Sequence, residues 1–212
     1  MSSSLPPTGA FIVFEGGEGS GKSTQIARLA HFLSAQEFTV VTTREPGGTA
    51  VGQLIRNVLL DPATGDLSPR TEALLYAADR AEHVHAVITP ALSAGSVVLS
   101  DRYVDSSLAY QGAGRQLKVD DVALLSSWAT QSLVPDLTIV LDIDPRIGLS
   151  RFEGADRLEA LSLGFHDRVR QGFLDLAGRE PSRYLVVDAT QSADAIEADI
   201  STRVLHVLQD RP

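Results

Sequence analysis

Short apolar runs recur along the chain, and polar residues do not alternate with the apolar ones inside them. They are rich in Val, Ile, Leu and Phe, which is typical of strands that are buried on both faces of a sheet. We predict five strands, over residues 11–15, 39–43, 97–100, 137–142 and 184–187.

Between these runs, hydrophobic residues recur at every third or fourth position, the spacing of a helix with one buried face. In the last such stretch, Ile196, Ile200 and Val204 lie on one side. Pro90 marks a bend or a break near the end of the longest stretch. We predict helices over residues 22–36, 51–60, 70–94, 119–131, 165–176 and 193–209.

Alternating strands and helices predict an α/β fold, in which right-handed crossovers build a five-stranded parallel sheet with helices on both faces. Residues 1–9 are rich in Ser and Pro and predict a disordered lead-in, and residues 10–212 predict a single domain. Ligands of such folds bind at the carboxyl ends of the strands. Chemistry is therefore expected just after Phe14, Thr43, Ser100, Asp142 and Val187.

Composition narrows the function classes for this chain of 212 residues. A net charge of −9 argues against a general nucleic-acid binder, which needs a basic face. The absence of cysteine excludes disulfides, thiol catalysis and cysteine-based zinc sites. No apolar run approaches the roughly 18 residues of a membrane span, and residues 1–9 lack the features of a signal peptide. A cytoplasmic protein is the expectation.

A glycine-rich segment joins the first predicted strand to the first predicted helix. It reads Gly16-Gly17-Glu18-Gly19-Ser20-Gly21-Lys22-Ser23. In this context, backbone N–H groups and the helix N-terminus bind phosphate oxygens. Lys22 is expected to reach the β- and γ-phosphates, and the Ser23 hydroxyl to ligate Mg²⁺. The motif predicts a nucleoside triphosphate but leaves the reaction open.

Two arginines at strand ends indicate a second phosphate group. Arg44 follows the second strand and precedes a Pro-Gly-Gly turn, where the backbone approaches a ligand closely. Asp101 and Arg102 follow the third strand. Asp101 is placed either to organise Mg²⁺ or to cap a helix. A hydrolase needs one phosphate site, whereas a phosphotransferase that acts on a nucleotide needs two.

Several motifs together resemble those of bacterial thymidylate kinases. They are the phosphate loop, Thr-Arg-Glu-Pro-Gly-Gly-Thr at 43–49, Asp-Arg-Tyr at 101–103 and Tyr-Gln-Gly at 110–112. The resemblance extends over nearly the whole chain after Gly9. It implies a three-layer fold of the P-loop NTPase type with a mobile lid at about 151–164. It also implies a homodimer that uses ATP and Mg²⁺ to phosphorylate dTMP to dTDP for dTTP synthesis, without nucleic-acid or membrane partners.

The resemblance assigns roles to matching positions. Residues implied around dTMP are Glu18, Arg44, Tyr76, Arg80, Arg102, Ser107, Tyr110 and Gln111. Glu18 would face the sugar near its 3′-hydroxyl, and Arg44 and Arg102 would hold the acceptor phosphate. Tyr76 would stack on thymine where many relatives have Phe, and Tyr110 would pack against C2′ of the sugar. Arg80 would reach the base edge or the acceptor phosphate, and Ser107 and Gln111 would hydrogen-bond the base.

For ATP, the resemblance implies binding by Gly16, Gly17, Glu18, Gly19, Ser20, Gly21, Lys22, Ser23, Thr24 and Ala189. Relatives whose phosphate loop lacks an arginine supply one from the lid, and this loop has none. Arg157 is the first candidate and Arg151 the second, in a lid that is shorter and poorer in arginine than is usual for that class. Lys22, Arg102, Glu18 and a lid arginine would form the catalytic set, with Ser23 and Asp101 at the metal.

Two other functions stay open from the residues alone. One is a kinase for another nucleoside monophosphate or for a deoxynucleoside; a nucleoside has no phosphate to require both Arg44 and Arg102. The other is a GTPase-like or ATPase switch. Such switches usually carry an Asn-Lys-x-Asp motif that reads guanine, and this sequence contains none.

Overall fold

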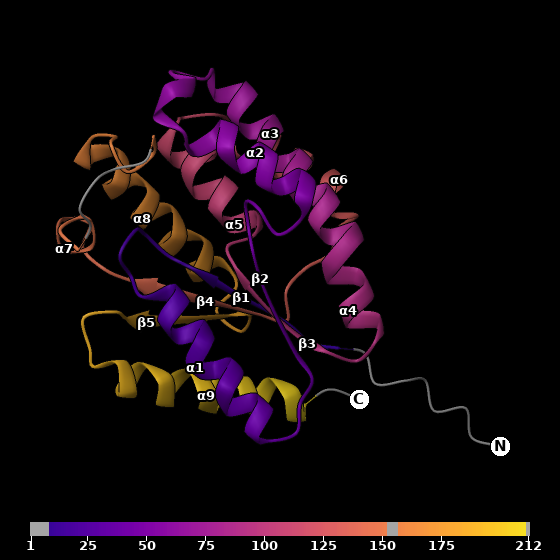
Figure 1. Ribbon diagram of the computed structural model, residues 1–212. Helices are drawn as coiled ribbons and strands as arrows, with labels where there is room; N and C mark the ends of the chain where they lie inside the picture. The colour runs from indigo at the N-terminus through magenta and orange to yellow at the C-terminus, as the bar shows by residue number, and fades with distance from the viewer. Residues whose placement is uncertain (1–8, 152–156, 211–212) are drawn as a thin grey trace.

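Strand β1, which leads into the phosphate loop, lies in the middle of a five-stranded parallel sheet with the order β2-β3-β1-β4-β5 (Figure 1). The structure is a computed structural model that describes residues 9–151 and 157–210. The strands are β1 (Phe11–Glu15), β2 (Val40–Arg44), β3 (Val97–Asp101), β4 (Leu137–Asp142) and β5 (Tyr184–Asp188). The α/β fold and all five predicted strands are confirmed, with ends that shift by one residue at most.

The predicted helices are also present. The main ones are α1 (Lys22–Ala35), α2 (Ala50–Leu60), α3 (Pro69–His83), α6 (Val119–Thr130), α8 (Leu163–Arg179) and α9 (Ala193–Gln209). The long stretch predicted at 70–94 consists of α3, a π-helical turn η2 (Val84–Ile88) and α4 (Thr89–Ser93). The π-turn ends two residues before Pro90, which has no N–H to continue an α-helical ladder.

Four short elements were not predicted. They are η1 (Pro62–Thr64), α5 (Val104–Ser107), the π-helical η3 (Leu108–Gly114) and α7 (Pro145–Leu149). Each is too short for helical periodicity to emerge from the sequence. Two of them, α5 and η3, carry residues of the site described below.

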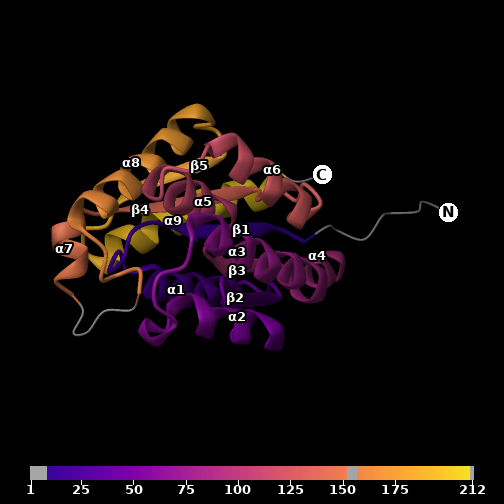
Figure 2. The ribbon, with the colours of Figure 1, turned by 90° about the horizontal axis from the view of Figure 1, so that it is seen from above.

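Side chains of the central strands alternate between two hydrophobic layers. Ile12 and Phe14 point to the face that α1 and α9 cover. Phe11 and Val13 point to the opposite face and pack with Val84 and Ile88. Figures 1 and 2 show α1 and α9 together on one side of the sheet and the other main helices on the opposite side. Burial on both faces explains why β1, β3 and β4 lack polar alternation. The edge strands β2 and β5 are partly exposed, so the expectation of burial on both faces is wrong for them.

The sheet register brings the predicted chemistry together. Phe14 of β1 pairs with Asp101 of β3, and Glu15 pairs with Val140 of β4. The phosphate loop after β1 therefore lies between the ends of β3 and β4. Of the predicted lid and lead-in, residues 152–156 and 1–8 lie outside the described residues. The single-domain division stays a prediction. No helix among the described residues has the length and apolar character needed to span a bilayer.

Replacing Leu33 with Ala should lower the free energy of unfolding by about 2–5 kcal/mol, because Leu33 of α1 is fully buried in the layer between α1, α9 and the sheet. Denaturant unfolding measures this change. His31→Ala, at an exposed position of the same helix, is the matched control and should shift stability by less than about 0.5 kcal/mol. Equal effects of the two substitutions would contradict the assigned core.

Candidate active site

The phosphate loop has a backbone that only glycine adopts easily. Gly19 and Gly21 have φ angles of 68° and 91°, in the left-handed region. A Cβ on Gly19 would also lie 2.2 Å from the carbonyl oxygen of Gly148. Gly21 is the N-cap of α1 and has no side chain to cap the helix. The first N–H groups of α1 therefore remain available for an anion.

Lys22 lies across the loop that it follows. Its Nζ donates to the carbonyl oxygens of Gly16 (3.2 Å) and Gly17 (3.0 Å), and the side chain is buried. Burial and the neighbouring charge of Arg102 lower the pKa of Lys22. The ammonium group is thus held at the phosphate loop, as the sequence motif predicts.

The predicted magnesium ligands lie side by side. Oγ of Ser23 is 3.5 Å from Oδ2 of Asp101. The other carboxylate oxygen of Asp101, Oδ1, is buried and has no hydrogen-bond partner among the described residues. A buried oxygen without a partner is costly unless a cation or a water molecule contacts it. A hydroxyl and a carboxylate are ligands that suit Mg²⁺, which takes its remaining ligands from phosphates and water.

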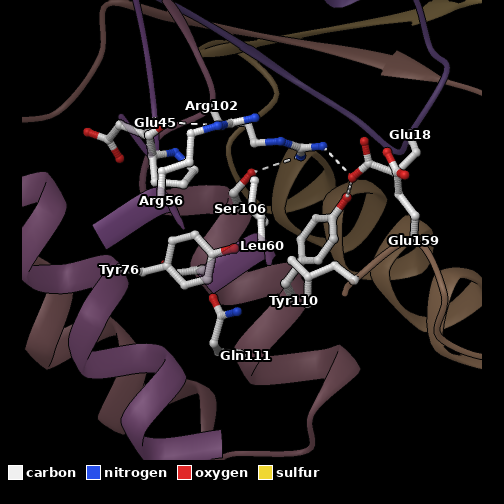
Figure 3. A pocket seen from close by; sticks show the side chains of 13 residues that line it. Glu18, Glu45, Arg56, Leu60, Tyr76, Arg102, Ser106, Tyr110, Gln111 and Glu159 are labelled. Carbon is white, nitrogen blue, oxygen red and sulfur yellow. Dashed lines mark hydrogen bonds and ion pairs between the residues drawn. The ribbon is translucent and has the colours of Figure 1, made fainter. Parts of the chain in front are cut away.

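Arg102 joins the phosphate loop to the wall opposite. Its NH1 donates to the carbonyl oxygen of Gly16 and to Oγ of Ser106, both at 3.1 Å. Its NH2 donates to Oε1 of Glu18 at 2.7 Å, and the same oxygen accepts from the hydroxyl of Tyr110 at 2.8 Å (Figure 3). The guanidinium also lies 5.0 Å from the centre of the Tyr110 ring.

These contacts keep Glu18 ionised. Burial acts to raise its pKa, but the charges of Arg102 and Lys22 and the hydroxyl of Tyr110 outweigh burial and lower the pKa to about 2. A carboxylate inside a phosphate-binding loop therefore faces cations on one side, which offsets its repulsion of phosphate.

Glu15 supports the turn that carries Arg102. The backbone of Arg102 has a φ of 72°, a left-handed conformation that is rare for arginine. Oε1 of Glu15 accepts from the N–H groups of Tyr103 (2.9 Å) and Ser106 (3.1 Å), and Oε2 lies 2.6 Å from the Ser106 hydroxyl. Burial and the nearby Asp105 carboxylate raise the pKa of Glu15 to about 8. Sequence reasoning missed this residue. A glutamate that ends a strand and directly precedes the glycine-rich loop gives no separate signal of a supporting role.

Two cavities open beside this turn. The larger, of about 570 Å³, follows the phosphate loop and is lined by 18–24, Arg44, Asp101 and Arg151. The smaller, of about 130 Å³, lies behind it and is lined by Tyr76, Ser107, Tyr110 and Gln111. Five residues line both cavities: Glu18, Glu45, Arg56, Arg102 and Glu159. Two ligands bound in these cavities would therefore meet at Glu18 and Arg102.

The smaller cavity brings together most of the residues expected around dTMP. Tyr76 of α3 is half-buried on its wall, and Ser107 and Gln111 come from the end of α5 and from η3. Figure 3 shows the ring of Tyr76 above the amide of Gln111. Arg44 instead lines the larger cavity and is exposed, with NH2 3.3 Å from Oε1 of Gln53. It stands at the entrance on the phosphate side.

Arg80 departs from the expectation that it contacts the base or the acceptor phosphate. Its side chain is 2% exposed and lines neither cavity. The guanidinium donates to Oε2 of Glu45 (2.7 Å), Oγ of Ser107 (3.1 Å) and the carbonyl oxygen of Tyr103 (2.9 Å). Arg80 thus pairs with a buried carboxylate and reaches the smaller cavity only through Glu45 and Ser107.

The two lid arginines lie in different surroundings. Arg157, the first candidate, is buried and donates to Oε2 of Glu72 (2.5 Å) and to the carbonyl oxygen of Leu59 (2.7 Å). Arg151, the second candidate, is exposed and donates to the carbonyl oxygen of Gly19 at 2.7 Å. In this structure Arg151 lies at the phosphate loop, and a buried carboxylate holds Arg157 away from it.

Other residues complete the comparison with the sequence. Thr24 lines the larger cavity as expected. Ala189 is buried, and its N–H donates to the carbonyl oxygen of Asp142, so it braces the ends of two strands and lines neither cavity. Arg56 and Glu159 line both cavities and were missed. Arg56 had a weak signal, as the one basic residue of the helix that follows the Arg44 loop.

Comparisons with known proteins agree on one family. A sequence profile of the family described as thymidylate kinase matches residues 14–200. The chain is 52% identical to the thymidylate kinase of Bifidobacterium longum strain DJO10A over 93% of this chain and 98% of the relative. It is 55% identical to that of Clavibacter sepedonicus over 95% of this chain and 96% of the relative. A crystal structure of thymidylate kinase from Ehrlichia chaffeensis, at 33% identity, superposes with a TM-score of 0.77 over 94% of this chain and 99% of that one.

The lowered pKa of Glu18 predicts a pH-dependent contribution to stability. Ionised Glu18 stabilises the fold above its ordinary pKa of 4.5, and this contribution is lost as the pH falls towards 2. Wild-type protein should therefore lose on the order of 3 kcal/mol more stability than Glu18→Gln between pH 5 and pH 2. Denaturant unfolding at a series of pH values measures the difference. Curves that stay parallel would contradict the Glu18–Arg102 contact.

Proposed function

The chain belongs to the thymidylate kinase family, which phosphorylates dTMP, and we propose that it binds the phosphates of ATP in the larger cavity and dTMP in the smaller. The observation that carries this proposal is the shared wall of the two cavities at Glu18 and Arg102. A donor and an acceptor that meet there have their reacting phosphates side by side, which is the main requirement of phosphoryl transfer.

On the donor side, the N–H groups of the loop and of the α1 N-terminus would hold the ATP phosphates, with Lys22 on the β- and γ-phosphates. Ser23 and Asp101 would hold Mg²⁺, which supplies positive charge against the phosphate oxygens when bound. The buried, unpartnered Oδ1 of Asp101 supports this assignment.

On the acceptor side, Arg102 would hold the dTMP phosphate, assisted by Arg56 and by Arg44 at the entrance. Tyr76 would stack on the base and Gln111 would hydrogen-bond it, since both line the far wall of the smaller cavity. Glu18 would accept from the 3′-hydroxyl of the sugar. Tyr110, held against Glu18 and Arg102, would fill the space beside C2′ and disfavour a ribose.

The reaction would be an in-line transfer of the γ-phosphoryl group to an oxygen of the dTMP phosphate. The acceptor oxygen already carries negative charge, so the protein supplies position and charge stabilisation and no general base. Lys22 and Arg102 would flank the transferring group. Arg151, at the phosphate loop, is the lid arginine that we assign to the same charge, in place of Arg157.

Substitutions of Arg102 and Lys22 should affect the binding of dTMP and the transfer from ATP differently. Arg102→Ala should weaken dTMP binding by about 10- to 100-fold and ATP binding much less, because it removes a charge-assisted contact to the acceptor phosphate while Lys22 and the loop N–H groups still hold ATP. Lys22→Ala should abolish phosphoryl transfer while dTMP still binds. Isothermal titration with each nucleotide, together with a coupled assay offering dTMP, dUMP, CMP, AMP or thymidine, measures these effects.

Circular dichroism should show that both variants remain folded. Near-normal turnover of Lys22→Ala, or equal losses of dTMP and ATP affinity in Arg102→Ala, would refute the assignment of the two cavities. A preference for thymidine over dTMP would instead favour the deoxynucleoside kinase alternative.

We also propose that the chain forms a cytoplasmic homodimer through an apolar patch. The patch consists of Leu54 of α2, Leu74 of α3, and Leu124 and Trp128 of α6, which are 58–81% exposed. The three helices lie next to each other on the same side of the sheet (Figure 1). Exposed apolar side chains on adjacent helices are typical of protein–protein interfaces. A cytoplasmic location is where ATP and dTMP are available.

Trp128→Glu should convert the dimer into a monomer, because it places a charge at the largest and most exposed side chain of the apolar patch. Light scattering should then give the 22.6 kDa mass of one chain in place of twice that value. His31→Glu, at an exposed position on the opposite side of the sheet, is the control and should stay dimeric. A wild-type protein that is monomeric at micromolar concentration would rule out the patch as a stable interface.

A further inference from the structure

Glu72 is a buried carboxylate directly behind the smaller cavity. It lies on α3 one turn before Tyr76 and has no exposed surface. Its Oε1 accepts from Nε2 of Gln111 (3.0 Å) and from Nε of Arg115 (3.2 Å). Its Oε2 accepts from NH2 of Arg115 (3.0 Å) and from NH2 of Arg157 (2.5 Å). Arg157, which was expected at the ATP phosphates, thus belongs to a cluster with Glu72, Gln111 and Arg115.

Two guanidinium groups against one carboxylate keep Glu72 ionised. Burial acts to raise its pKa, but the hydrogen bonds from Arg115, Gln111 and Arg157 lower it below the ordinary value. An ionised carboxylate can only accept hydrogen bonds. Whatever faces Oε1 of Glu72 must therefore be a donor.

This requirement fixes the amide of Gln111. Only the NH₂ end of a glutamine can donate, so Nε2 must face Glu72 and the carbonyl oxygen Oε1 must face away from it. The charge of Glu72 thus removes the usual ambiguity between the oxygen and the nitrogen of the Gln111 amide. Figure 3 shows the oxygen of Gln111 turned towards the ring of Tyr76, on the cavity side. Gln111 therefore presents an acceptor to the cavity.

An acceptor at this position distinguishes pyrimidine bases. Thymine and uracil carry a hydrogen on N3, which donates to a carbonyl oxygen. Cytosine has a lone pair on N3, which would face the Gln111 oxygen as a second acceptor. Two buried acceptors that face each other form no hydrogen bond, and both have lost their hydrogen bonds to water. The binding free energy of cytosine is therefore less favourable.

We propose that Glu72 is a positioning residue that locks the Gln111 amide with its oxygen towards the base and so selects bases that carry N3–H over cytosine. The inference rests on the proposed binding of dTMP in the smaller cavity. Arg115 and Arg157 contribute by holding the charge of Glu72. None of the three contacts the phosphates or the reacting atoms, so each acts on selectivity through Gln111.

The test compares dUMP and dCMP, which share the sugar and lack the 5-methyl group but differ at N3 and at the exocyclic group on C4. Glu72→Gln keeps the shape of the side chain, but its own amide can donate to Gln111, so that either orientation of Gln111 is satisfied. The ratio of kcat/KM for dUMP over dCMP should then fall by at least about tenfold relative to wild type. The ratio for dTMP over dUMP, which reports the 5-methyl group, should stay within about threefold.

Glu72→Asp is the conservative control, since it retains an acceptor-only carboxylate. It should keep the dUMP-over-dCMP ratio closer to wild type than Glu72→Gln does, even if its overall activity is lower. A loss of activity that is equal for dUMP and dCMP in Glu72→Gln would show that Glu72 only supports the fold, and would overturn the proposal. A wild-type enzyme that uses neither dTMP nor dUMP would instead refute the proposed function.

A measurement on the wild-type enzyme does not depend on a variant that folds. The side-chain NH₂ protons of Gln111, assigned in ¹⁵N spectra by their loss in Gln111→Leu, should exchange slowly with water because Glu72 holds them in a buried position. They should remain slow when dTMP binds, since the base contacts the oxygen and not the NH₂ group. Rapid exchange of both protons, or a new contact of the NH₂ group with the base, would overturn the proposal.

Discussion

The contact of Arg102 with Glu18 and with the Gly16 carbonyl is the interaction on which the site depends. It ties the glycine-rich loop after β1 to the wall of the smaller cavity. The contact requires a left-handed backbone at Arg102, and the Glu15 carboxylate holds the following N–H groups in place. Backbone strain of this kind persists only where the surroundings determine it, and here the surroundings are a buried strand end. This turn places Arg102 in the wall that the two cavities share.

Around the smaller cavity, buried carboxylates fix the positions of the basic side chains that contact them. Glu45 takes Arg80 and His83, and Glu72 takes Arg115 and Arg157. A buried charge without a partner is strongly destabilising, and each of these carboxylates forms an ion pair with at least one arginine. Arg80, Arg115 and Arg157 therefore support the smaller cavity from behind its wall and do not line it. Their influence on the ligand passes through Ser107 and Gln111, which the same clusters orient.

Much of this architecture could be predicted from sequence because its determinants are local. The apolar runs of β1 and β4 and the periodicity of α9 follow from burial on two faces or on one, and the phosphate loop follows from glycines next to Lys22 and Ser23. Parallel strands then bring Arg44, Asp101 and Arg102 to one edge of the sheet. The short α5 and η3 could not be predicted, because fewer than two turns give no periodic pattern. Yet they carry Ser107, Tyr110 and Gln111, whose expected positions came from the family resemblance.

By itself, the sequence determined the α/β fold, the phosphate loop, the family, and the edge of the sheet where the chemistry lies. Tertiary structure decided which of several similar arginines faces which partner. Arg80 and Arg157 were expected at ligands and are instead buried against Glu45 and Glu72, while Arg151, Arg56 and Arg102 line the cavities. The reason is that a guanidinium has the same chemistry in every context. Whether it contacts a substrate or a carboxylate depends on residues distant in sequence, which only the folded chain brings within hydrogen-bonding distance.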